Sequence, residues 1–127
     1  MKDIKILFSE EEIKNRIQQI ANQIDRDYYG KEIVVVSVLK GAIFFTVDLV
    51  KNIKTSIELE TVQIASYEGT ESTGKVNLKK DLDMSIEGKD VLIIEDIVDT
   101  GTSLKYLKEY FISKNPNSVK IAVLLDK

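Results

Sequence analysis

The stretch from Val91 to Leu104, VLIIEDIVDTGTSL, runs directly from a buried strand into a helix and constrains the fold more than any other part of the chain. Its first four residues are apolar and β-prone without polar alternation, which indicates a strand covered on both faces, as in a parallel sheet. Glu95, Asp96 and Asp99 follow, and an amphipathic helix is expected from Ser103 to about Lys114. We therefore predict an α/β fold with a mostly parallel sheet flanked by helices, in which this turn binds a ligand.

The loop from Thr100 to Ser103 has the composition of an anion site. Gly101 permits backbone conformations that a Cβ atom forbids, so successive N–H groups can point toward one phosphate. The helix start adds free N–H groups and a positive dipole end. Glu95 and Asp96 would repel a bare phosphate, so they favour sugar hydroxyls or Mg²⁺. Helix capping is a simpler interpretation of one hydroxyl residue, but not of the nearby carboxylates.

The segment EDIVDTG, preceded by VLII, resembles the phosphoribosyl-pyrophosphate (PRPP) signature of the type I phosphoribosyltransferases. The resemblance implies that nine consecutive residues bind the ribose and 5′-phosphate of PRPP: Glu95, Asp96, Ile97, Val98, Asp99, Thr100, Gly101, Thr102 and Ser103. It implies Mg²⁺ as cofactor, held by Glu95 and Asp96. It also implies that Asp99 is the catalytic base near N7 of a purine.

A second strand-to-helix turn precedes this stretch. Ile33 to Val38 reads as a buried strand, and a helix is expected from about Ile43 to Asn52. Lys40 and Gly41 lie between them, where a lysine beside a glycine is a weak anion-binding signal. VLKG resembles the pyrophosphate loop of the hypoxanthine-guanine branch, in which the Leu39-Lys40 peptide is cis. The resemblance therefore assigns Lys40 and Gly41 to pyrophosphate.

The remaining pattern completes the α/β prediction. Ser9 to Glu12 is a capping box, and Phe8 and Ile13 are placed as a hydrophobic staple. The helix that begins here is expected to run to about Tyr28, and Gly30 stops it. Further strands are expected at 57–65 and 118–126, and 79–88 reads as a polar connection.

The segment from Glu68 to Lys75 is polar and glycine-rich and predicts an exposed loop. A plain solvated loop is one interpretation. The resemblance implies another, a flexible lid that begins at Ser66 and Tyr67, closes over the reaction centre, and returns along 76–78.

The same loop partly matches the motif of an unrelated family. Gly69, Gly74 and Lys75 match the GxxxxGK pattern of a P-loop, but Val76 stands where a P-loop needs Ser or Thr to bind Mg²⁺. No helical pattern follows either, so a P-loop ATPase is disfavoured.

LLDK at the chain end resembles the family strand whose lysine donates to the exocyclic oxygen of the purine. Lys127 would thus favour 6-oxopurines, because lysine only donates hydrogen bonds, although a solvated terminal lysine is the simpler interpretation. Family members continue into segments that complete a hood over the purine. We expect residues 1–127 to be a single phosphoribosyltransferase core domain that is C-terminally short, leaving Ile4 to Phe8 without the hood as partner.

Composition limits the partners. The net charge of −3 argues against nucleic acid, and the absence of cysteine and of any signal or membrane segment fits a cytoplasmic protein. The resemblance implies transfer of ribose-5-phosphate from PRPP to hypoxanthine or guanine, giving IMP or GMP and pyrophosphate. It also implies a homo-oligomer, either a dimer or a tetramer. The alternative is a module of the same fold that binds PRPP or a nucleotide with little or no turnover.

Overall fold

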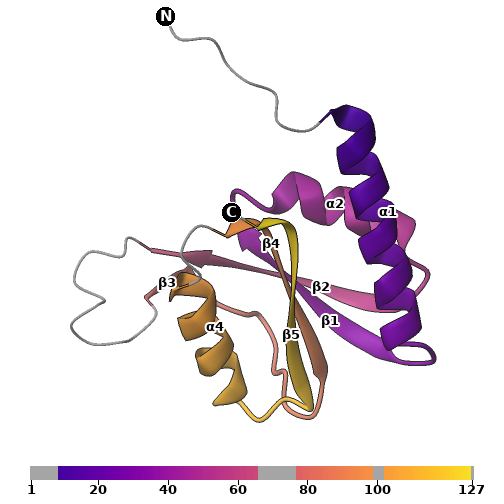
Figure 1. Ribbon diagram of the computed structural model, residues 1–127. Helices are drawn as coiled ribbons and strands as arrows, with labels where there is room; N and C mark the ends of the chain where they lie inside the picture. The colour runs from indigo at the N-terminus through magenta and orange to yellow at the C-terminus, as the bar shows by residue number, and fades with distance from the viewer. Residues whose placement is uncertain (1–8, 66–76, 99–101, 127) are drawn as a thin grey trace, which may run out of the picture.

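The computed structural model describes residues 9–65, 77–98 and 102–126 (Figure 1). In chain order the elements are α1 (Glu10–Asp27), β1 (Glu32–Leu39), α2 (Ile43–Asn52), β2 (Ser56–Ile64), β3 (Leu78–Lys80), β4 (Asp90–Val98), α4 (Thr102–Ile112) and β5 (Ser118–Asp126).

The described strands form one sheet in the order β3-β2-β1-β4-β5. β1 pairs in parallel with both β2 and β4, and β4 pairs in parallel with β5. Among the strands of the described residues, only the short strand β3 runs antiparallel, against the end of β2. The predicted α/β fold with a mostly parallel sheet is confirmed.

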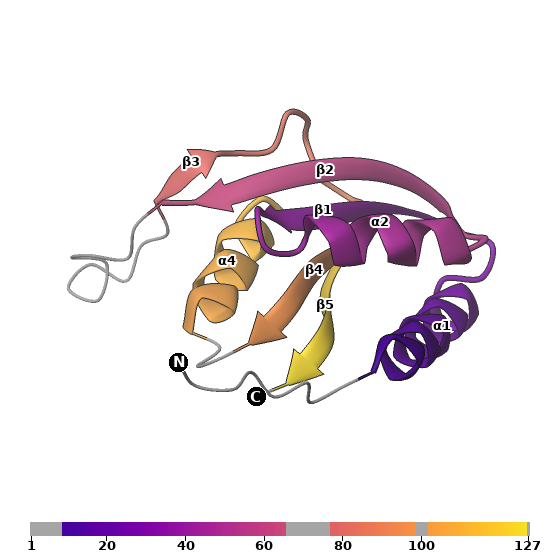
Figure 2. The same cartoon turned by 90° about the horizontal axis from the view of Figure 1, so that it is seen from above.

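Alternate residues of the central strands point into two separate hydrophobic layers. Ile33 and Val35 of β1 pack with the apolar sides of α1 and α2, whereas Val34 and Val36 pack with α4 on the opposite side of the sheet. Figure 2 shows α4 apart from α1 and α2 in this way. Burial on both faces explains why β1 is a continuous apolar run.

The start of α1 is fixed by its own sequence, as predicted. The Ser9 hydroxyl accepts the Glu12 N–H at 3.1 Å, and the Ser9 N–H donates to the Glu12 carboxylate at 3.2 Å. The helix ends at Asp27, and Gly30 follows with a φ of 77°. A left-handed conformation after a helix favours glycine, which supports the predicted stop signal. Phe8 of the predicted staple lies outside the described residues.

The predicted end of β4 is wrong. The sequence placed Glu95 and Asp96 after a strand ending near Ile94, but β4 continues to Val98 because β5 runs alongside it, with Val98 opposite Asp126. A neighbouring strand extends pairing past charged residues that would end an isolated strand.

The predicted polar connection from 79 to 88 is also partly wrong. Lys80 belongs to β3, opposite Gln63 of β2. Ile86 is fully buried in the layer that contains α4. Leu82, Met84 and Ile86 alternate with polar residues, but of these three only Ile86 is fully buried, so the pattern alone did not predict its burial.

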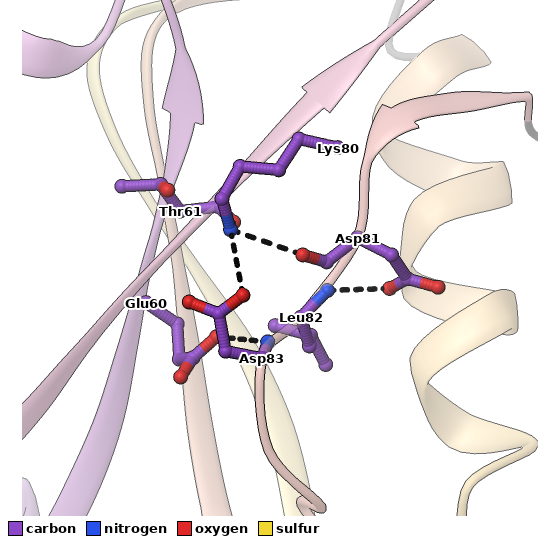
Figure 3. Close-up of polar contacts among 6 residues, drawn as sticks. All are labelled: Glu60, Thr61, Lys80, Asp81, Leu82 and Asp83. Carbon is purple, nitrogen blue, oxygen red and sulfur yellow. Dashed lines mark hydrogen bonds and ion pairs between the residues drawn. The ribbon is translucent and has the colours of Figure 1, made fainter.

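Polar contacts hold β3 and the following turn onto β2 (Figure 3). The Lys80 ammonium donates to the carbonyl oxygens of Thr61, at 2.8 Å, and of Asp81, at 3.0 Å, and lies 3.5 Å from the Asp83 carboxylate. The Asp83 N–H donates to the buried carboxylate of Glu60 at 2.8 Å. These contacts fix the chain directly after the segment predicted as a lid.

Some predictions lie outside the described residues. These are the lid (Ser66, Tyr67 and Glu68 to Lys75), Ile4 to Phe8, Asp99, Thr100, Gly101 and Lys127. None of the helices within the described ranges is both long and apolar enough to cross a membrane.

Candidate functional site

The candidate site lies where the sheet connections diverge. From β1 the chain passes through α2 to β2 on one side, and from β4 it passes through α4 to β5 on the other. β1 and β4 are neighbours, with Ile33 opposite Asp90 and Ser37 opposite Ile94, so their carboxyl ends meet at one edge (Figure 1). In open α/β sheets, the crevice at such a divergence is where ligands bind.

The loop after β1 contributes the first half of the site. The Leu39–Lys40 peptide bond is cis, as the resemblance implied. Lys40 and Gly41 are exposed, whereas Ala42 is fully buried. The cation and the glycine are therefore open to a ligand, while the next residue anchors the loop.

This loop lies against the acidic end of β4. A Cβ atom added to Gly41 would lie 3.3 Å from Oδ1 of Asp96 and 3.6 Å from Oδ2. Such a contact is closer than side chains normally permit, so glycine allows the backbone to approach the carboxylate. The structure thus brings together Gly41 and Asp96, which the sequence assigned to two halves of one site.

Glu95 and Asp96 form an adjacent acidic pair, and both are half-buried. The Asp96 backbone N–H donates to Oε1 of Glu95 at 3.0 Å. Burial raises the pKa of Glu95 to about 7, together with a hydrogen bond that protonated Glu95 donates to the Asp96 carboxylate and the negative charge of that carboxylate, despite the opposing effect of the backbone N–H. Two adjacent carboxyl groups that repel one another in this way favour binding of a cation or of hydroxyl donors.

The pair fits a magnesium ion only in part. Within residues 9–65, 77–98 and 102–126, no group of three or more acidic, histidine or cysteine side chains is placed to hold a metal. Magnesium commonly uses one or two carboxylates and completes its shell with water and phosphate oxygens. Glu95 and Asp96 therefore suit an ion that arrives with a phosphorylated ligand.

The other predicted residues of this stretch are placed through their backbone. Ile97 and Val98 pair with Leu125 and Asp126 of β5, and Thr102 is the first residue of α4. Because β4 extends to Val98, the turn starts later than the sequence predicted, whereas α4 begins at Thr102, one residue before the predicted start at Ser103.

Two buried hydroxyl residues near the site were not singled out from the sequence. Ser37 of β1 and Thr46 of α2 lie 2.7 Å apart through their side-chain oxygens. The only sequence signal was a hydroxyl residue within each of two apolar runs, VVVSV and FFTV.

The site and fold agree with known proteins. A family model for the phosphoribosyl transferase domain matches residues 3–127. Hypoxanthine-guanine phosphoribosyltransferase of Streptococcus thermophilus is 48% identical over 128 residues, which cover 99% of this chain and 71% of the relative. The enzyme of the same name from Staphylococcus aureus is 48% identical over 127 residues, or 98% of this chain and 71% of the relative.

Solved structures give the same result. A hypoxanthine-guanine phosphoribosyltransferase from Bacillus anthracis, with HEPES in its active site, has a TM-score of 0.91 and 42% identity, covering 99% of this chain and 75% of that one. A hypoxanthine phosphoribosyltransferase from Staphylococcus aureus has a TM-score of 0.90 and 48% identity, covering 97% of this chain and 67% of that one. The chain therefore belongs to the phosphoribosyltransferase family.

Proposed function

We propose that the chain is a purine salvage enzyme that transfers ribose-5-phosphate from PRPP to hypoxanthine or guanine, giving IMP or GMP and pyrophosphate. The close approach of the Gly41 backbone to Asp96, at the strand ends where this family binds PRPP, is the observation that carries the proposal. The 48% identity to relatives named for this reaction supports it.

The two halves of the site have complementary charges for PRPP. The exposed Lys40 and the N–H of Gly41 would bind pyrophosphate, the leaving group, which carries negative charge. Glu95 and Asp96 would accept hydrogen bonds from the ribose diol and bind Mg²⁺. When bound, the ion would offset negative charge on the phosphate oxygens.

The loop between β4 and α4 would bind the 5′-phosphate. Thr102 and Ser103 begin a helix of 11 residues, and a helix N-terminus favours an anion. Ile97 and Val98, the last residues of β4, would lead into this loop, and Thr100 and Gly101 would complete it.

Asp99 would act on the purine. Cleavage of the bond between ribose and pyrophosphate develops positive charge on the sugar, so the chain's main contribution is to position and stabilise charge. Asp99 would accept a proton from the purine as N9 attacks. Lys127 would donate to the purine oxygen, and the lid beginning at Ser66 and Tyr67 would exclude water.

The wider assignments are part of the same proposal. Residues 1–127 would form a single phosphoribosyltransferase core domain that acts in the cytoplasm on small molecules, without nucleic acid or membrane partners. It would assemble as a homodimer or tetramer. One similar structure, from Trypanosoma cruzi, concerns how the C-terminal region affects the oligomeric state and activity of that enzyme.

The test is a spectrophotometric assay with PRPP, Mg²⁺ and each of hypoxanthine, guanine and adenine. We expect IMP and GMP to form and AMP not to form. Asp99→Asn should lower turnover by about 10²- to 10⁴-fold with little change in PRPP affinity, because it removes a proton acceptor of similar size. PRPP binding without any product would instead favour a binding module, and unchanged turnover in Asp99→Asn would remove Asp99 from the mechanism.

A further inference from the structure

A buried hydrogen-bonded pair joins β1 to α2 directly behind the pyrophosphate loop. The side chains of Ser37 and Thr46 are 1% and 2% exposed, and their oxygen atoms lie 2.7 Å apart. The Thr46 hydroxyl also lies 2.7 Å from the carbonyl oxygen of Ala42. The pair therefore reaches from the strand before the loop to the residue that ends it.

The direction of these hydrogen bonds can be assigned by counting protons. A hydroxyl group donates one hydrogen bond and accepts others, whereas a carbonyl oxygen only accepts. Thr46 must use its proton on Ala42, so Ser37 must donate to Thr46. A threonine in a helix often bonds a carbonyl one turn earlier. The bond from Ser37 is the less common part, because it ties the helix to the strand.

Ala42 is held from both sides as a result. Its carbonyl oxygen also accepts a hydrogen bond from the Thr46 N–H at 2.8 Å, and its own N–H donates to the carbonyl oxygen of Val38 at 3.2 Å. The Ile43 N–H donates to the carbonyl oxygen of Lys40 at 3.2 Å. These bonds close the loop at both ends, so the position of Gly41 beside Asp96 depends on them.

Packing alone does not require two hydroxyl groups here. The neighbouring buried residues Val36, Val38 and Phe45 are apolar. An apolar pair would fill the same space without removing polar groups from water. Unlike apolar contacts, hydrogen bonds are directional, so the hydroxyl groups fix how the strand, the helix and the loop lie relative to one another.

We propose that Ser37 and Thr46 are positioning residues, which place the backbone of Lys40 and Gly41 for pyrophosphate binding. The inference rests on the proposed function, because it takes Lys40 and Gly41 to be the pyrophosphate loop. Neither hydroxyl touches the substrate, and both act through Ala42.

The test measures binding of magnesium pyrophosphate by calorimetry, which does not depend on turnover. Thr46→Val removes both side-chain hydrogen bonds and should weaken pyrophosphate binding by about tenfold, because the loop would no longer be held in its binding position. Thr46→Ser keeps the hydroxyl and should bind within about twofold of the unaltered chain. Ser37→Ala leaves the bond from Thr46 to Ala42 and should give an intermediate loss.

Thr55→Val is the matched control. The Thr55 hydroxyl donates to the Asp25 carboxylate at 2.7 Å at the opposite edge of the sheet, so this variant loses a threonine hydrogen bond away from the loop. It should lower the unfolding temperature but leave pyrophosphate binding unchanged.

The double variant Ser37→Ala/Thr46→Val separates positioning from stability. It leaves no hydroxyl without a partner, so it should be more stable than Thr46→Val, yet it should bind pyrophosphate no better. Recovery of binding together with stability would overturn the inference. If the unaltered chain binds magnesium pyrophosphate, and Thr46→Val and the double variant both bind it as tightly as the unaltered chain, the inference alone is wrong. If the unaltered chain does not bind magnesium pyrophosphate, the assignment of Lys40 and Gly41 fails as well.

Discussion

A Cβ atom placed on Gly41 would lie 3.3 Å from Oδ1 of Asp96, so the loop after β1 lies close to the end of β4 at this point. The two residues are far apart in the sequence and are brought together by parallel pairing of their strands. This contact defines the first prediction.

Gly41→Ala should weaken binding of PRPP with Mg²⁺ by about tenfold. The added methyl group would push either the loop or the Asp96 carboxylate away from its present position. Gly41 is exposed and its φ lies outside the left-handed region, so the unfolding temperature should change little. Calorimetric titration and thermal unfolding of the same sample measure both effects. Unchanged affinity would show that this contact does not position the site.

Ile86→Ala should lower the free energy of unfolding by about 2–5 kcal/mol. Ile86 is fully buried among residues of β4 and α4 although its sequence neighbours are polar. Met84→Ala is the control in the same connection, because Met84 is 38% exposed. It should cost less than about 1 kcal/mol, in the range of surface substitutions. Equal midpoints in urea for the two variants would contradict the packing of Ile86.

Glu60→Ala should lower the free energy of unfolding by about 1–3 kcal/mol, because it leaves the Asp83 N–H without its acceptor. Glu60→Gln keeps an acceptor oxygen and should cost less. Glu58 is the matched control on the same strand, since it forms a partly exposed ion pair with Lys89 at 3.3 Å. Glu58→Ala should cost no more than about 1 kcal/mol. A larger loss for Glu58 than for Glu60 in urea denaturation would contradict the prediction.

Asp90 should make the protein sensitive to acid. The Ser118 hydroxyl hydrogen bond, aided by Asn117 and the positive charges of Lys31 and Lys120, lowers the pKa of Asp90 below 3.8 although burial opposes this. A carboxyl group with a lowered pKa in the folded state contributes stability above its unfolded pKa, and the contribution is lost as pH falls through the folded value.

Asp90→Asn should therefore be less stable than the unaltered chain at pH 6, with the difference shrinking below pH 3.8. Urea denaturation of both proteins between pH 6 and about pH 3 measures this difference. A difference that stays constant with pH would show that the charge of Asp90 does not contribute.

Much of the fold could be predicted because local patterns and tertiary contacts agree. The apolar run of β1 and the capping box at Ser9 each determine their element with little outside help. β4 was predicted too short because Glu95 and Asp96 look like the end of a strand, whereas pairing with β5 continues past them. Neighbouring strands cannot be recognised from the residues of one strand.

The site likewise contains residues that could be predicted from the sequence and residues that could not. Gly41 and Asp96 could be placed together in advance, because the carboxyl ends of neighbouring parallel strands share one edge. Ser37 and Thr46 could not, because their contact depends on how α2 lies across β1. A hydroxyl residue in an apolar run shows only that some partner is needed, not which one.

The ladder between β1 and β4 limits how this chain can change in length during evolution. Deletion of one residue between Ile33 and Ser37 would draw the Lys40 loop back by about 3.3 Å and turn the remaining side chains to the opposite face. Apolar residues would then leave one hydrophobic layer and crowd the other, while the loop lost its place beside Asp96. Insertions and deletions should therefore be eliminated within β1 and β4.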